Sequence, residues 1–192
     1  MTNDGEIDDA DYIREVEAFR REKDEFFESD PQSPIPMEER LMGVRARYYP
    51  PALLFRVRAE VAPFAEPAVV DLATSTGDIR PQLRYAALDF RIGGHELHLT
   101  GFAEPDDKNP RELFIPFRDA TSGHDTYGAG RYLEAEVEDA GDGRRAAVLD
   151  FNLAYNPYCA YSPSYSCPVP PAENALAVAI TAGERTFFDD HD

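Results

Sequence analysis

The chain has 192 residues, of which 43% are hydrophobic and 11% aromatic, so it is long enough and apolar enough to build one packed domain. Thirty-seven acidic residues against nineteen basic ones give a formal charge of −18, which disfavours nucleic acid and anionic membrane surfaces as partners. No apolar run approaches the roughly 20 residues of a membrane span, and no basic-then-apolar leader opens the sequence.

The cations are almost all arginines, since only Lys23 and Lys108 are lysines. An acidic, lysine-poor surface is typical of a protein that stays soluble in concentrated salt. At molar salt the Debye length falls to about 3 Å, so neighbouring carboxylates stop repelling one another. We therefore expect a halophilic source and a cytoplasmic location in a salt-loaded cell; an ordinary acidic protein is the alternative.

The first predicted element is an amphipathic helix over residues 11–30, preceded by a disordered acidic tail at 1–10. Side chains recur at three- and four-residue spacing at Tyr12, Val16, Phe19, Lys23, Phe26 and Phe27. Ser29-Asp30-Pro31 ends the pattern. We expect this helix to pack outside the domain that follows or to plug one end of it.

A single β domain is predicted over residues 40–186, with a short acidic tail at 187–192. Between Phe55 and Val61 apolar and charged residues alternate, as in a half-buried strand. Further strands are predicted at Ala68–Ala73, Gln82–Ile92, His95–Ala103, Glu112–Phe117, Arg131–Glu138, Arg145–Leu153 and Ala175–Thr181. At least seven strands joined mainly by short glycine turns indicate a mostly β fold, either an antiparallel β-barrel or a strongly curved sheet.

Two segments interrupt the alternation, and the first joins two strands at residues 116–131 (PFRDATSGHDTYGAGR). Loops on a rigid sheet commonly carry binding groups, and arginines here can clamp an anion or pair with the neighbouring acid. The alternative is a hairpin loop whose polar side chains bond to its own backbone. The candidate ligand-binding residues of this segment are Arg118, Asp119, Thr121, Ser122, His124, Tyr127 and Arg131.

The second segment, residues 150–173 (DFNLAYNPYCAYSPSYSCPVPPAE), holds four tyrosines, two cysteines and five prolines. Prolines lower the entropy of the unfolded chain, so we expect an ordered segment laid across one end of the barrel. Tyrosines suit the wall of a pocket, or equally a cap over an open barrel end. The candidate ligand-binding residues of this segment and its flank are Asn152, Asn156, Tyr158, Cys159, Tyr161, Cys167, Glu173 and Asn174.

The two segments together, FRDATSGHDTYGAGRYL (117–133) and LDFNLAYNPYCAYSPSYSCPVPPAENALAVAITAGE (149–184), resemble family 1684 of the domains of unknown function, in its haloarchaeal type. The resemblance covers about the C-terminal half of the chain, and the N-terminal helix is similar to the opening segment of the family. It implies that the two segments belong to one recurring constellation. The activity of that family is not established, so the resemblance implies no catalytic residue.

Cys159 and Cys167 are eight residues apart, unlike the close spacing of zinc knuckles. Two free, buried thiols are the leading interpretation. A disulfide that closes the loop is an alternative that a reducing cytoplasm disfavours. Zinc held by both thiols with His124 as a third ligand is a further alternative, but we expect no metal and no cofactor.

Enzymatic signatures are weak. His124-Asp125 beside Ser122 superficially resembles a Ser-His-Asp set, but no G-x-S-x-G elbow surrounds the serine. Glu173 and Asp150 flank the second segment, where a carboxylate pair with separated pKa values can do acid–base work, but capping or turn roles are the stronger interpretation.

Three functions remain open at this stage. The first is a small-molecule-binding barrel whose pocket is closed by both segments, with tyrosine walls and with Arg118 and Arg131 as anchors. The second is an enzyme of unknown reaction that uses Asp119, His124 or Glu173 in that pocket. The third is a structural or interaction protein whose partner surface is the N-terminal helix with the tyrosine-rich loop. The oligomeric state is not predicted.

The charge leads to a first testable prediction. The free energy of unfolding should rise as KCl is raised from about 0.1 M to about 2 M, because screening removes the repulsion among carboxylates. Denaturation curves recorded across the KCl series measure this. Equal stability at low and molar salt would contradict a halophilic origin.

Overall fold

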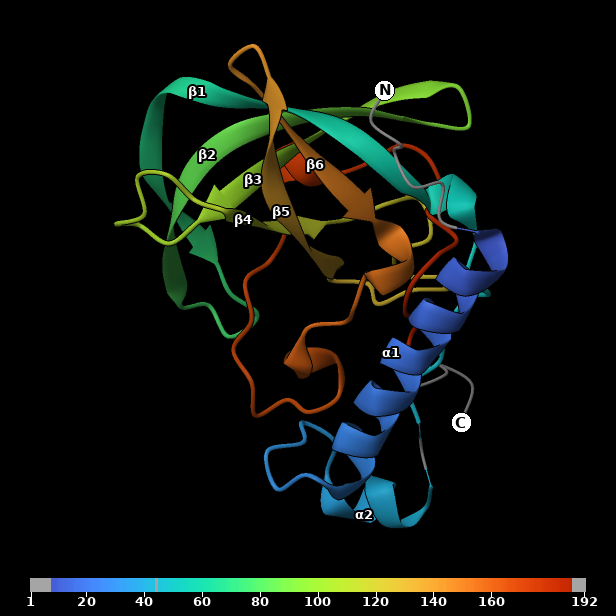
Figure 1. Cartoon of the computed structure of the whole chain (residues 1–192). Coiled ribbons are helices and arrows are strands. Elements are labelled where there is room, and N and C mark those ends of the chain that lie inside the picture. The colour runs from blue at the N-terminus through green and yellow to red at the C-terminus, as the bar shows by residue number, and fades with distance from the viewer. Residues whose placement is uncertain (1–7, 44, 188–192) are drawn as a thin grey trace.

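Six antiparallel strands form a closed barrel in the computed structural model, which describes residues 8–43 and 45–187 (Figure 1). Each strand pairs with the next along the chain, and the first pairs with the last. The strands are β1 (Arg56–Ala73), β2 (Ile79–Ile92), β3 (His95–Ala103), β4 (Glu112–Phe117), β5 (Arg131–Gly141) and β6 (Arg144–Asp150). The predicted mostly β fold with an antiparallel barrel is confirmed.

The long strand β1 closes the barrel because it pairs with β6 as well as with β2. Residues 56–61 pair with β6, whereas residues 60–63 and 68–73 pair with β2, across a break in register between Pro63 and Ala68. The two strands predicted on either side of this break are therefore one strand. The barrel has six strands, and the expectation of at least seven is corrected.

The weakest seam of the barrel lies between β3 and β4. Their ladder contains a single residue pair, Phe102 opposite Phe114, whereas β4 and β5 pair over all of Glu112–Phe117. The boundaries of β3 and β4 agree with the predicted strands at both ends.

Alternation along the strands fills the barrel with side chains. Leu88, Leu99, Leu113 and Leu149 are fully or almost fully buried inside it. Aromatic rings close the end from which β6 leaves, where Phe151 packs against Phe90 and Phe117 with ring centroids 5.7 and 5.3 Å apart. The interior is therefore a packed core.

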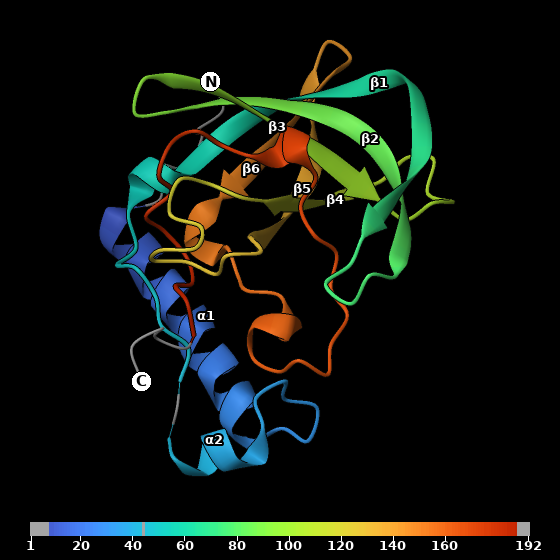
Figure 2. The ribbon, with the colours of Figure 1, turned by 180° about the vertical axis from the view of Figure 1, so that it is seen from behind.

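Helix α1 (Asp9–Ser29) lies along the outside of the barrel, as Figures 1 and 2 show from opposite sides. Its buried residues are Tyr12, Val16, Arg20 and Phe27. Phe19, expected in the buried stripe, is 47% exposed. Arg20 takes the buried position because its guanidinium donates to the carbonyls of Tyr49 (2.8 Å) and Asn152 (3.1 Å).

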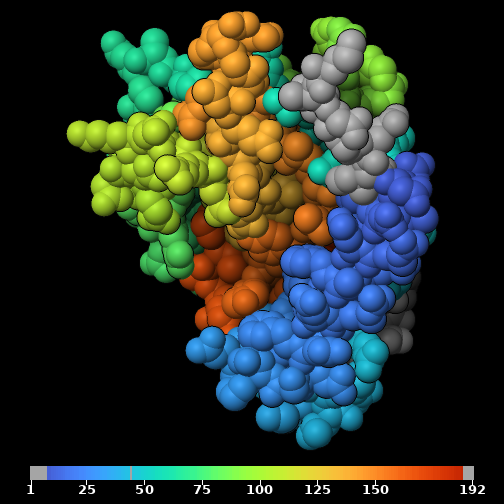
Figure 3. Space-filling model, in the orientation of Figure 1, coloured from blue at the N-terminus to red at the C-terminus, as the bar shows by residue number. Residues whose placement is uncertain are grey.

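A small second core joins α1 to the C-terminal part of the chain. Phe27, Ile35, Tyr161 and Phe187 form it, near the short helix α2 (Met37–Leu41). In Figure 3 the orange and red atoms of the C-terminal segment fill the space between the barrel and the N-terminal helices. The apolar stripe of α1 is thus largely used within the chain, which weakens its interpretation as a partner surface.

Residues 151–187 form no strand, and the strand predicted at Ala175–Thr181 is wrong. This stretch, the C-terminal segment, contains three 3-10 turns: η2 (Phe151–Leu153), η3 (Tyr158–Ala160) and η4 (Ala172–Asn174). Strand β6 accordingly ends at Asp150, before the predicted end at Leu153. Within the described ranges, no helix has the length and apolarity to cross a membrane. Of the predicted tails at 1–10 and 187–192, residues 1–7 and 188–192 lie outside the described residues, whereas α1 already begins at Asp9.

Candidate functional site

The two unusual segments meet in space, through backbone hydrogen bonds. The amide of Arg118 donates to the carbonyl of Asn174 (2.9 Å), and the amide of Leu176 donates to the carbonyl of Arg118 (2.8 Å). One step further along, Ala120 donates to Val178 (3.1 Å). The loop 118–130 therefore packs directly against residues 174–186, most of which follow the segment expected to close the pocket (150–174); with that segment itself it makes the contact of Tyr127 with Cys159 (3.7 Å).

Arg131 and Asp119 form an ion pair whose side chains have no solvent exposure. Arg131 Nη2 donates to Asp119 Oδ2 (2.8 Å) and to the carbonyl of Ile180 (2.9 Å). Its Nη1 donates to the carbonyls of Ala182 and Glu184. With these bonds the Arg131 guanidinium holds one edge of the C-terminal segment. It has no exposed surface left for a ligand, so the predicted role of Arg131 as an anchor is corrected.

Several other polar side chains of the loop bond locally. Asp119 Oδ1 accepts from the amide and hydroxyl of Thr121 (2.8 and 2.6 Å), and Thr121 contacts the hydroxyl of Thr126 (2.8 Å). Ser122 Oγ accepts from the amide of Asp119 (3.1 Å), and His124 is exposed. These bonds match a hairpin loop whose polar side chains bond within the loop.

Three asparagines of the second segment are buried and serve as bridges between backbones. The amide group of Asn174 accepts from Thr100 N (2.7 Å) and donates to the carbonyls of Thr100 (2.9 Å) and Pro116 (2.7 Å). It thereby links β3 to β4 where their ladder is almost absent. Asn152 binds both N and O of Ala52 (2.9 Å each), and Asn156 donates to the carbonyl of Arg185 (2.8 Å).

Glu184 is a buried carboxylate that the sequence analysis missed. It accepts from the hydroxyl of Tyr161 and from the amide of Asn156 (2.7 Å), and it pairs with Lys23 of α1. The only sequence signal for it is indirect: Lys23, one of two lysines, occupies the apolar stripe of an otherwise arginine-rich helix. Its contacts tie α1 to the C-terminal segment.

Two predicted site residues lie apart from this network. The side chain of Arg118 is exposed. Glu173 forms a bidentate pair with Arg84 of β2 (2.7 and 3.0 Å), and this hydrogen bonding lowers the pKa of the Glu173 carboxyl. Asp150 binds the hydroxyl of Tyr12 (2.7 Å), so the two flanking carboxylates each hold a different element.

A hollow of about 390 Å³, here called the tyrosine pocket, opens on the outer face of the barrel beside residues 155–168. Its lining residues are Arg80, Gln82, Glu104, Phe114, Tyr132, Tyr155, Pro157, Tyr158, Tyr165, Ser166, Cys167 and Pro168. Of the predicted site residues only Tyr158 and Cys167 are among them. The loop 118–130 contributes none.

Hydrogen bonds and ring contacts fix the walls of the tyrosine pocket. The hydroxyl of Tyr132 donates to the carbonyl of Pro168, and that of Tyr155 to Glu134. Tyr158 and Tyr165 meet edge to face with ring centroids 5.2 Å apart. Burial raises the pKa of Tyr132, Tyr155 and Glu134, so both phenols remain protonated donors at neutral pH.

The two cysteines lie together beside this pocket. Both are free thiols, with Cys159 partly exposed and Cys167 buried. The amide of Cys159 donates to Cys167 Sγ (3.3 Å), and the hydroxyl of Tyr127 donates to Cys159 Sγ (3.7 Å). Hydrogen bonds from the Cys167 thiol and from Tyr127 lower the pKa of Cys159 to about 6. In the part of the chain that the structure describes, no three metal-binding side chains are grouped.

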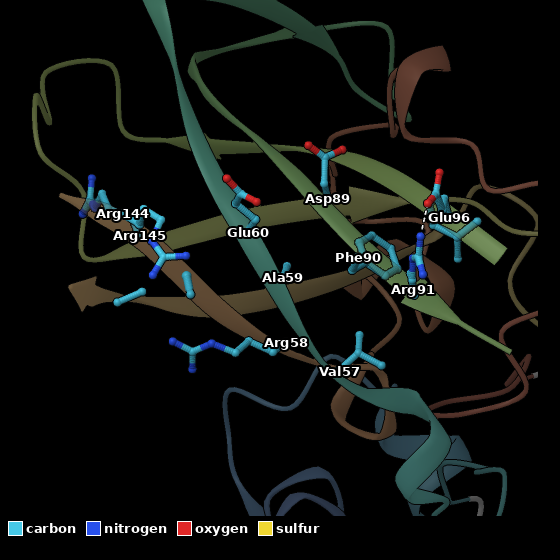
Figure 4. A pocket seen from close by; sticks show the side chains of 13 residues that line it. Val57, Arg58, Ala59, Glu60, Asp89, Phe90, Arg91, Glu96, Arg144 and Arg145 are labelled. Carbon is cyan, nitrogen blue, oxygen red and sulfur yellow. Dashed lines mark hydrogen bonds and ion pairs between the residues drawn. The ribbon is translucent and has the colours of Figure 1, made fainter. Parts of the chain in front are cut away.

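A larger hollow, of about 800 Å³, lies where β1 turns away from β2 to pair with β6 (Figure 4). Val57, Ala59, Phe90 and Leu97 contribute its apolar lining. Its charged side chains are of both signs: arginines at 58, 91, 144 and 145 and acids at 60, 89 and 96.

Most of the arginines in this larger hollow have partners. Arg91 pairs with Glu96 and Arg58 with Glu138, while Arg145 donates to Tyr85 Oη (2.6 Å) and to the carbonyl of Pro110 (3.0 Å). Because the hollow has similar numbers of positive and negative side chains, it favours neither an anionic nor a cationic ligand. The tyrosine pocket is therefore the stronger candidate.

The buried ion pair leads to a prediction on stability. Arg131→Met should lower the free energy of unfolding by about 3–5 kcal/mol, because Asp119 and three carbonyls lose their partner while staying buried. The control is Arg58→Met, which breaks an exposed pair (3.4 Å) and should cost at most about 1 kcal/mol. Urea denaturation in high KCl measures both. Equal effects would contradict the assigned role of Arg131.

The thiol contacts lead to a prediction on pH dependence. Alkylation of Cys159 by iodoacetamide should reach half its maximal rate at about pH 6, since the thiolate is the reactive form. An unperturbed cysteine would do so near pH ~8.5. Tyr127→Phe, which removes one donor, should move the midpoint upward. Peptide mass mapping follows the reaction, and a wild-type midpoint near that of a free cysteine would refute the contacts.

Comparisons with known proteins agree with the fold. The sequence matches the family described as "Protein of unknown function (DUF1684)" over residues 44–185. The solution NMR structure of an uncharacterized protein from Haloarcula marismortui is similar, with 45% identity and a TM-score of 0.71, covering 92% of this chain and 95% of that one. No curated protein matches. The matched range contains the whole barrel and nearly all of the C-terminal segment, and the chain belongs to the DUF1684 family.

Proposed function

We propose that this protein binds a small, planar organic molecule in the tyrosine pocket. The observation that carries the proposal is a hollow of about 390 Å³ whose walls include four tyrosines and Phe114, with Arg80, Gln82 and Glu104 among its polar groups. Ligand pockets commonly measure about 300–1,000 Å³ and combine apolar walls with a few polar groups.

Contacts within the protein hold the walls of the tyrosine pocket in place. Tyr132 is held by Pro168 and by ring contact with Phe114 (4.8 Å) and Tyr155 (5.7 Å). A preformed wall loses little conformational entropy on binding. Flat aromatic faces and edges favour a flat ligand, because ring stacking adds energy beyond simple burial.

Arg80 supplies the polar contact that orients the ligand. Its guanidinium has one long hydrogen bond to the carbonyl of Ser166 (3.4 Å), so donors remain for an anionic or carbonyl oxygen. We therefore propose Arg80 of β2 as the ligand anchor instead of Arg118 and Arg131, of which the second is fully buried in its ion pair with Asp119.

The tyrosine pocket therefore includes one of the two segments of the pocket proposed from the sequence. Residues 155–168 form one wall, whereas the loop 118–130 packs behind it. The enzymatic alternative has lost its support, since Asp119, His124 and Glu173 line neither of the two hollows described above.

We further propose that the protein works in a salt-loaded cytoplasm and binds neither nucleic acid nor membrane. The formal charge of −18 supports both statements, because it repels phosphate groups and is tolerated where salt screens it. The similar protein from Haloarcula marismortui supports the halophilic origin.

Native mass spectrometry of the protein purified from its own host tests the binding function. A retained small molecule is expected, and Tyr165→Ala should weaken its binding about tenfold through lost ring contact. Arg80→Gln should weaken a ligand with an oxygen anion by a similar or larger factor.

Leu54→Ala is the matched control, because it removes an exposed apolar side chain outside the pocket. It should leave the bound fraction unchanged. Protein free of any ligand, or a ligand retained equally by all three variants, would refute the proposed site.

A further inference from the structure

The paired thiols have a geometry that neither the fold nor ligand binding requires. We propose that Cys159 and Cys167 are a reversible dithiol–disulfide pair, in which Cys159 attacks a low-molecular-weight disulfide and Cys167 resolves the resulting mixed disulfide. This proposal does not depend on a ligand in the tyrosine pocket.

The first support is proximity. Cys167 Sγ lies 3.3 Å from the amide nitrogen of Cys159, and each thiol is within hydrogen-bonding reach of the other. A disulfide requires Cβ atoms about 4 Å apart, and the contact of Cys167 Sγ with the backbone of Cys159 brings the two side chains into the same neighbourhood. The intervening residues 160–166 already form the closed loop that the bond would span.

The second support is that both ends of the loop are anchored. Cys167 exchanges two hydrogen bonds with Ser75 in the turn between β1 and β2: its amide donates to Ser75 Oγ (3.1 Å), and its carbonyl accepts from Ser75 N (2.9 Å). Cys159 lies within η3, two residues after Pro157, and contacts Tyr127. Anchored ends keep the thiols together at little entropic cost.

The third support is the division of roles. Cys159 is partly exposed and its thiolate is stabilised by two donors, so it is the thiol that an external reagent meets first. Cys167 is buried, and donating to Cys159 raises its pKa, so it keeps its proton until the mixed disulfide has formed. Attacking and resolving thiols commonly differ in this way.

The chemistry balances with one external disulfide, RSSR. The Cys159 thiolate attacks one sulfur, the S–S bond breaks, and RS⁻ leaves with the electron pair. Cys167 then attacks Cys159 Sγ and expels a second RS⁻, which takes the Cys167 proton. Two protein thiols are oxidised to one disulfide, and RSSR is reduced to two thiols.

Oxidation would act on the tyrosine pocket through the chain. Tyr158 precedes Cys159 directly, and Tyr165 lies between the two cysteines. A bond between the thiols restricts the separation of the two wall residues and replaces the thiolate that accepts from the Tyr127 hydroxyl by a neutral, weaker acceptor. The oxidised form therefore has a more constrained wall.

The experiment treats the reduced, folded protein in high KCl with 2-hydroxyethyl disulfide, a neutral probe that the acidic surface does not repel. After acid quenching, intact mass and peptide mapping should show a protein that has lost two hydrogen atoms, with Cys159 linked to Cys167. Dithiothreitol should restore the thiols. A mixed disulfide that persists on folded wild-type protein, or thiols that react only after unfolding, would overturn the proposal.

Variants assign the roles. Cys167→Ser should accumulate the mixed disulfide on Cys159, and Cys159→Ser should react more slowly by at least about tenfold, because the remaining thiol is buried. Ser164→Ala, in the same loop, should behave as wild type. Faster reaction at Cys167 than at Cys159 would refute the assignment. If a serine variant fails to fold, the wild-type cross-link decides the proposal alone.

Discussion

The structure depends on one constraint: the C-terminal segment packs against the barrel with isolated backbone pairs, such as Tyr155 with Tyr132 of β5, instead of a continuous ladder, so side chains satisfy part of its backbone. Buried N–H and C=O groups without partners are costly. Arg131 binds the carbonyls of residues 180, 182 and 184, and Asp119 accepts from the amide of Ile180 (3.2 Å). Asn174 does the same for β3 and β4. The polar residues that make these segments conspicuous are largely used as backbone partners.

Because these polar side chains bind backbone groups, the side chains that remain available lie on another face, at the tyrosine pocket. Once Asp119, Arg131 and the buried asparagines are assigned to the fold, the groups left for the functions proposed above are the tyrosines and thiols at residues 155–168. Aromatic rings provide adhesive surface without needing charge, which suits a protein whose surface is already strongly acidic. The same residues hold Cys159 beside the pocket wall, so the proposed ligand binding and the proposed thiol chemistry would share one piece of chain.

The strand positions could be predicted because burial of alternate residues leaves a clear pattern, and His95–Ala103 and Glu112–Phe117 agree at both ends. The same pattern gave a wrong prediction at Ala175–Thr181. Alternation indicates which side chains are buried, but it does not indicate whether a neighbouring strand is present to pair with the backbone. The helical spacing likewise predicted that Phe19 is buried. Arg20 is buried instead, because its guanidinium donates to two backbone carbonyls. Glu184 had no local signal, as its partners are 23 to 161 residues away in sequence.

The single residue pair between β3 and β4 has a consequence for synthesis of the protein. All six strands have been made once Asp150 is in place, yet the amide group that joins this seam belongs to Asn174. A growing chain on the ribosome therefore holds β3 and β4 without the bridge between them until Asn174 has emerged. During that interval the exposed strand edges are where a chaperone would find its binding site.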